Sequence, residues 1–211
     1  MRPLIFSIVA ALAFQPLAHA QARADDETCA PAATALRGKP RGAGYLNAVR
    51  TLMSCPQRGP IALAAEWASP PNDTTDLRLL GAVSGNLRDN RILDAVRGIA
   101  LQNSRPREVR LAALRTLVRY FDPRLAVEFK EPPRPDLPDA AYVMLGEWSH
   151  PPGNDGSQPL PASVRQDVLD VLAQLETSPG DTVVEKVARY LRKRLEERGK
   201  QDEPGMTFQA E

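Results

Sequence analysis

The sequence predicts an all-α fold built from stacked helical hairpins. Two stretches, AVRTL at 48–52 and ALRTL at 113–117, share four of their five residues and lie 65 positions apart. A related flank recurs at about half that step, with DLRLLGA at 76–82 aligned on EVRLAAL at 108–114. Periods in the thirties are typical of helical hairpins that stack into an α-solenoid, because each hairpin covers the apolar face of the next.

The first twenty residues predict a secretory signal peptide. Arg2 precedes an apolar run at 4–14, and Ala18-His19-Ala20 forms a small-x-small exit. The run is shorter than the roughly 20 residues that span a bilayer, and no later stretch is long enough. An uncleaved N-terminal anchor is the alternative. Cleavage after Ala20 would leave 191 of the 211 residues, which suits a single domain at 21–199.

The charge balance argues against a nucleic-acid-binding protein. Removal of Arg2 with the signal peptide leaves 26 basic and 26 acidic residues. A neutral chain lacks the electropositive field that attracts phosphates. Aromatic residues make up 5% of the chain, which leaves few platforms for stacked bases.

Cys29 and Cys55 are the only cysteines, and an exported chain with an even count favours a disulfide. The stretches 29–37 and 43–55 read as two short helices around a Gly/Pro turn at 38–42. An antiparallel hairpin places the start of its first helix beside the end of its second. The sequence therefore predicts a Cys29–Cys55 bridge, with two free or intermolecular thiols as the alternative.

Apolar spacing and capping residues predict six further helices. Their expected ranges are 60–68, 74–87, 89–103, 106–121, 161–176 and 181–199. Asp89 and Asp181 are natural N-caps, and Pro106 suits a first turn because its missing N–H has no helical partner there. Gly199 predicts the end of the last helix, and we expect residues 200–211 to be a disordered tail.

The stretch PREVRLAALRTL (106–117) resembles the second helix of a HEAT-type repeat, in which an aliphatic–Arg pair is followed by small residues and then Leu. The matching positions are Val109, Arg110, Ala112, Ala113 and Leu117. In DLRLLGAVSG (76–85), Leu77, Arg78 and Gly81 match, whereas Gly85 replaces the expected Leu. The resemblance covers about 60–130. It implies a short right-handed α-solenoid that acts as a binding scaffold, without common catalytic residues.

A proline-rich interruption at about 131–161 breaks the predicted repeat. It contains eight prolines, and between them DAAYVMLGEW (139–148) is apolar enough for a short helix or strand. Long irregular segments in compact domains are often either functional or linking. Trp148 and His150 therefore have two readings. Either Trp148 packs the segment down and His150 is exposed, or both belong to a ligand-facing lip.

Arginines are concentrated in the middle of the chain. From Arg88 to Arg124 there are nine arginines and four acidic residues, whereas 128–155 holds six acidic and two basic residues. The HEAT resemblance places second helices on the concave side, which makes four arginines candidate binding residues for an acidic peptide or polyanion. These are Arg78, Arg110, Arg115 and Arg119. The alternative is that they pair with neighbouring acids and play a structural role.

Catalytic signatures are absent from the sequence, and we expect no enzymatic activity, cofactor or metal. His150 is the single histidine of the mature chain, and its neighbour Ser149 is not placed to form a triad with it. The leading hypothesis is an exported, non-catalytic scaffold that binds a protein or peptide partner. The alternatives are a small secreted hydrolase that uses carboxylates such as Glu147 or Asp155, and a purely structural envelope protein.

Overall fold

The computed structural model describes residues 27–38, 42–68, 73–83, 89–129, 136, 143–147, 162–178 and 180–201. The chain forms two compact units, Met1–Glu66 and Trp67–Glu211. The predicted signal peptide at 1–20 lies outside the described residues.

The first unit is a disulfide-linked group of helices. Residues 27–37 are helical, and α2 (Ala43–Met53) and α3 (Arg58–Trp67) follow. Cys29 and Cys55 are bonded with their Cα atoms 6.0 Å apart, which confirms the predicted pairing. Both cysteines are buried beside Leu36 and Leu52 in the core. At the start of α3, Gly59 lies so close to the Leu52 carbonyl oxygen that a side chain there would collide with it.

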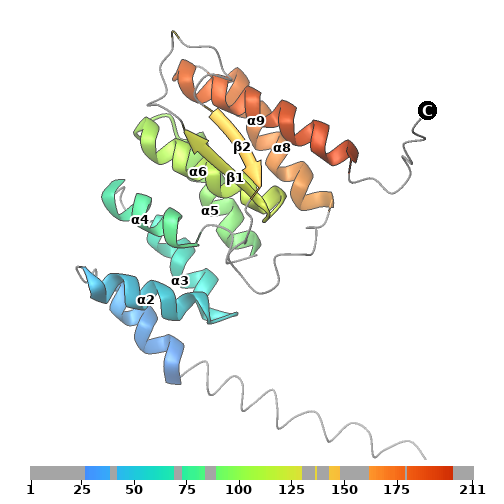
Figure 1. Cartoon of the computed structure of the whole chain (residues 1–211). Coiled ribbons are helices and arrows are strands. Elements are labelled where there is room, and N and C mark those ends of the chain that lie inside the picture. The colour runs from blue at the N-terminus through green and yellow to red at the C-terminus, as the bar shows by residue number, and fades with distance from the viewer. Residues whose placement is uncertain are drawn as a thin grey trace, which may run out of the picture. The chain divides into compact units, whose positions relative to one another are not determined.

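The described part of the second unit contains five helices, which are drawn in Figure 1. They are α4 (Asp73–Val83), α5 (Asn90–Leu101), α6 (Arg107–Phe121), α8 (Ala162–Thr177) and α9 (Thr182–Gln201). The predicted N-caps are confirmed, because Asp89 accepts from the Arg91 amide and Asp181 from the Val183 amide. Gly199 does not end the last helix, contrary to the prediction. It is not among the glycines with the positive φ of a terminal glycine, and α9 continues to Gln201.

Helix α6 is the centre of this unit. It contacts α4 and α5, which precede it, and α8 and α9, which follow it. Eleven of its fifteen residues are buried, including Val109, Leu114 and Leu117. A buried ion pair between Arg105 and Asp76 joins the turn before α6 to α4. Neighbours cover most sides of α6, and its four residues that are not buried mark the side that stays open.

The described chain is mostly helical, as the all-α prediction expected, and it also contains a two-stranded antiparallel ribbon. Strand β1 (Leu125–Phe129) pairs with β2 (Val143–Glu147), with Leu125 opposite Glu147 and Phe129 opposite Val143. Side chains alternate in burial along β1, where Leu125 and Val127 face inward. The ribbon contacts α6 through β1 and α9 through β2. The predicted irregular segment at 131–161 thus contains a strand, which was one of the two forms expected for 139–148.

Candidate functional site

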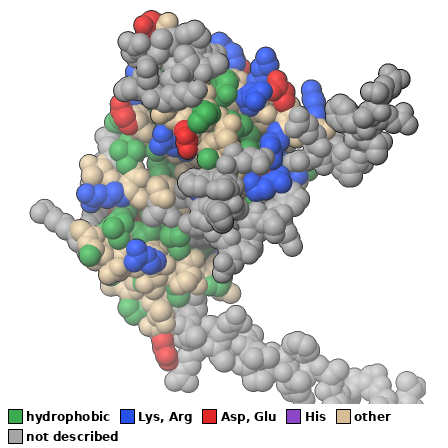
Figure 2. All heavy atoms as spheres, viewed as in Figure 1, with side chains coloured by type: hydrophobic (Ala, Val, Ile, Leu, Met, Phe, Trp, Pro, Cys, Tyr) green, Lys and Arg blue, Asp and Glu red, His purple; other side chains and the backbone are tan. Residues whose placement is uncertain are grey.

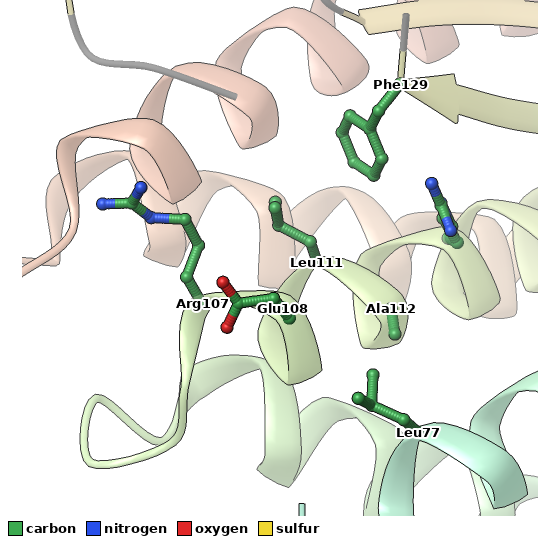
Figure 3. Close-up of a pocket in the computed structure, with 7 residues that line it drawn as sticks. Leu77, Arg107, Glu108, Leu111, Ala112 and Phe129 are labelled. Carbon is green, nitrogen blue, oxygen red and sulfur yellow. The ribbon is translucent and has the colours of Figure 1, made fainter. Parts of the chain in front are cut away.

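A groove in the second unit is the candidate binding site (Figure 3). Its volume is about 370 Å³, and α4, α6 and β1 supply its walls. The lining residues are Leu77, Arg107, Glu108, Leu111, Ala112, Arg115 and Phe129. Figure 3 shows Phe129 on one side of Leu111, with Ala112 and Leu77 on the other. The volume lies in the range of small-ligand pockets, so it suits a few side chains.

Helical periodicity creates the groove floor. Glu108, Leu111, Ala112 and Arg115 stand at i, i+3, i+4 and i+7 on α6, so they share one face of the helix. The middle of that face is apolar and its two ends are charged. The facing wall from α4 presents Leu77, whose side chain is 38% exposed. The exposed Leu77 and the apolar floor together form a hydrophobic surface that an apolar side chain of a ligand could contact.

Arg115 is held at the groove by an aromatic ring. Its guanidinium carbon lies 4.4 Å from the centroid of the Phe129 ring, within cation–π range. Desolvation lowers the pKa of Arg115, and attraction to Glu128 opposes that shift. Arginine remains charged at physiological pH under either influence. Arg115 makes no hydrogen bond or ion pair with any residue that the structure describes, so its donors are open to a ligand.

The second arginine of the groove is already engaged. Arg107 donates from Nε to Asp181 Oδ2 at 2.7 Å, which ties the start of α6 to the start of α9. Burial by itself would raise the pKa of Asp181. The hydrogen bond from Arg107, those from the Val183 and Val184 amides and attraction to Arg107 hold it below its ordinary value. Arg107 therefore has a structural partner, and Arg115 is the cation that the groove offers.

The four predicted arginines fall into two groups. Arg78 is exposed on α4, one position after Leu77, and Arg115 lines the groove. Arg110 and Arg119 are buried and do not line the groove. Arg110 is 3% exposed and donates from Nε to the Ala100 carbonyl oxygen, and Arg119 is buried as well. Both arginines are buried because α6 lies between other helices. The HEAT resemblance places this helix on an open concave side, and it does not account for the helices α8 and α9 that pack on α6.

The remaining predicted residues cannot be placed at the groove. Trp148, His150 and Asp155 lie outside the described residues, and Glu147 is described only through its backbone at the end of β2. Arg115 is the one lining residue that was predicted as a site residue, and the other six were not, namely Leu77, Arg107, Glu108, Leu111, Ala112 and Phe129. For Leu77 and Glu108, the helical spacing around Arg78 and Arg115 was an available signal. Phe129 had no sequence signal beyond the apolar character of 125–129.

The chemistry of the groove suits binding. Its seven lining residues include one carboxylate and two guanidinium groups, without a hydroxyl, thiol or imidazole that could serve as nucleophile or histidine base. Among the described residues, no group of three or more His, Cys, Asp and Glu side chains could hold a metal ion. Figure 2 shows basic and acidic side chains interspersed over the visible face.

Comparisons with protein-family models, curated proteins and solved structures found no significant match. No helix in the described part of the chain is long and apolar enough to cross a membrane.

Proposed function

We propose that this chain is an exported, non-catalytic scaffold, a HEAT-like helical stack, that binds a segment of a protein or peptide partner in the groove between α4, α6 and β1. The observation that carries the proposal is an apolar floor flanked by Arg115, a cation without a hydrogen-bond acceptor among the described residues. Such a site combines a contact for an apolar side chain with a donor for a polar group, which is the usual composition of a recognition pocket.

The expected affinity for one segment is modest. Full burial of one leucine-sized side chain contributes about 1.5–3 kcal/mol, and an exposed ion pair adds about 0.2–1 kcal/mol. Association costs at least about 4 kcal/mol in lost translational and rotational freedom. Binding therefore depends on walls that are already in place. The groove meets that condition, because Leu77 and Leu111 stand on helices and Phe129 on a paired strand.

Export is supported by two features. The Cys29–Cys55 bond is typical of oxidising compartments, and the first twenty residues have the layout of a signal peptide. Determination of the N-terminus of the protein recovered from its native host tests this part. A mature chain that begins at Gln21 supports export, and a retained Met1 contradicts signal cleavage.

The binding proposal is tested by substitution in the groove with a matched control elsewhere. Leu77→Asp changes an exposed leucine of the groove wall, and Leu46→Asp changes one of similar exposure, 44%, on α2. Both variants should keep the helical circular dichroism and melting temperature of the wild type, since neither side chain is in the core. The oxidised variants and the wild type are then used for affinity capture from the native envelope or culture fraction.

We expect a partner that the wild type and Leu46→Asp retain and that Leu77→Asp loses. A photoreactive residue at position 77 should cross-link the same partner, and one at position 46 should not. This second readout places the partner at the groove. The proposal is wrong if Leu77→Asp captures the same proteins as the wild type, or if cross-links form at position 46 and not at position 77.

A further inference from the structure

We infer that the groove selects an extended peptide segment in which an apolar side chain stands between a cationic residue and a carboxylate. The cation would meet Glu108, the apolar side chain Leu77 and Leu111, and the carboxylate Arg115. This inference rests on the proposed function and adds the chemistry and the arrangement of the ligand.

The two ends of the groove carry opposite charges at a defined spacing. Glu108 and Arg115 are seven positions apart on α6, which corresponds to about 10.5 Å along the helix axis. Seven residues make almost two full turns, so both side chains leave the same face. Leu111 and Ala112 lie between them on that face. The groove is therefore negative at one end, apolar in the middle and positive at the other end.

Both end charges are available to a ligand. Glu108 makes no ion pair or hydrogen bond through its side chain with any described residue, and its neighbour Arg107 is bound to Asp181. The guanidinium of Arg115 stacks on the Phe129 ring and has no hydrogen-bond acceptor among the residues that the structure describes. Stacking on a ring fixes the guanidinium plane and leaves its N–H edge for a carboxylate, a geometry in which two parallel hydrogen bonds can form.

An extended chain matches this spacing. Side chains of a strand alternate between faces, so positions i, i+2 and i+4 point the same way and span about 13 Å between their first and last Cα atoms. Flexible side chains absorb the difference from 10.5 Å. A segment of the type Lys-x-Leu-x-Asp would place its cation at Glu108, its leucine over the apolar floor and its carboxylate at Arg115. A purely acidic segment would leave Glu108 facing a like charge, which weakens binding.

The test is a set of double-mutant cycles between the full-length oxidised protein and synthetic peptides, with dissociation constants from NMR titration. The matched peptide is acetyl-Lys-Ser-Leu-Ser-Asp-amide, and the other three replace Lys by Gln, Asp by Asn or Leu by Ser. The protein variants are Arg115→Gln and Glu108→Gln, with Arg189→Gln on the exposed surface of α9 as the control. A short ligand of this kind should bind the wild type with a Kd of about 1 mM.

For the wild type, we expect a loss of about two- to fivefold in affinity when either charge of the peptide is neutralised. Arg115→Gln should abolish the difference between the Asp and Asn peptides and keep the difference between Lys and Gln. Glu108→Gln should do the reverse. Arg189→Gln should behave as the wild type. This pattern assigns each end of the peptide to its partner in the groove.

Other outcomes overturn the inference and separate it from the proposed function. If all four peptides bind equally, or if neither variant changes the preference between charged and neutral peptides, the bipolar selection is wrong. Binding that depends on the leucine and on Leu77 alone would refute the inference and leave a peptide-binding groove in place. A matched peptide that shows no saturable binding at low millimolar concentration would refute the inference, and the capture experiment with Leu77→Asp would then judge the groove independently.

Discussion

Reduction of the Cys29–Cys55 disulfide should destabilise the first unit by about 3.5 kcal/mol. The bond joins residues 26 positions apart, and closure of a loop of that length removes about 12 cal/mol/K from the entropy of the unfolded chain. At 25 °C this entropy corresponds to the stated free energy. Native packing should change little, because both sulfur atoms stay in the core after reduction.

Urea unfolding of the oxidised and reduced protein, followed by circular dichroism, measures the effect. With an m-value of about 1–3 kcal/mol/M, the midpoint of the affected transition should fall by about 1.2–3.5 M. The second unit, Trp67–Glu211, contains no cysteine and supplies an internal reference. A Cys29→Ala/Cys55→Ala variant controls for other effects of the reductant, since its unfolding should be the same with and without it.

The reasoning fails if reduction shifts no transition, or shifts it by an amount equivalent to less than about 1 kcal/mol. That result would mean that the reduced unfolded chain already keeps these segments close together, so that the bond removes little entropy.

Three other predictions concern stability. Arg105→Met should destabilise the second unit by about 3–5 kcal/mol in urea unfolding, because it removes the guanidinium that pairs with the buried carboxylate of Asp76. The double variant Arg105→Met/Asp76→Leu should recover most of this loss, and a double variant as unstable as the single one would contradict the ion-pair explanation. Burial alone would raise the pKa of Asp122, yet hydrogen bonds from Arg124 and attraction to Arg124 and Arg198 hold it below its ordinary value. The ionised Asp122 carboxylate therefore stabilises the fold fully above its unfolded-state pKa of about 3.9. This stabilisation is lost as the pH falls through the lower pKa that Asp122 has in the folded protein. The difference in unfolding free energy between the wild type and Asp122→Asn should accordingly shrink below about pH 4, and a constant difference would argue against it. Gly59→Ala should lower the melting temperature of the first unit, because its new Cβ meets the Leu52 carbonyl oxygen, whereas an unchanged melting temperature would show that α3 can shift at no cost.

Local signals in the sequence account for most of the helices. The apolar spacing of 89–103 and 106–121, together with Asp89 as a cap, predicted α5 and α6 to within about two residues at each end. The same is true of α8 and of the start of α9, where Asp181 is the cap. Helical spacing and capping depend on residues only a few positions apart, so a single sequence is enough to predict them.

Features that depend on distant contacts were not predictable in the same way. Strand β1 is a five-residue apolar run, too short for its periodicity to separate strand from helix, and its partner lies beyond a proline-rich stretch. Arg110 is buried, donates to the Ala100 carbonyl oxygen, and is attracted to Asp181 and Glu185, which lie much later in the chain. A repeat pattern singles out such an arginine, but it does not show whether the guanidinium donates hydrogen bonds to a ligand or to the protein itself.

At the candidate site, the sequence predicted Arg115 as a binding residue and did not predict its contact with the Phe129 ring. Arg115 was a predicted binding residue, and it lines the groove. Its position over Phe129 depends on how β1 turns back along α6, which is a tertiary contact. Glu108 stood in the repeat motif beside the predicted arginines. Its place in the groove lining depends on how α4 and β1 pack around α6, which is tertiary structure.

The central position of α6 also sets the order in which the second unit can mature. Helices α4 and α5 are made before α6, but α9 begins at Thr182, 61 residues after Phe121. At a synthesis rate of about 5–20 residues per second, α6 waits about 3–12 s for that cover. During this interval its apolar surface is open to chaperones and proteases. Folding of the second unit is thus expected to be completed only after most of the chain has been made.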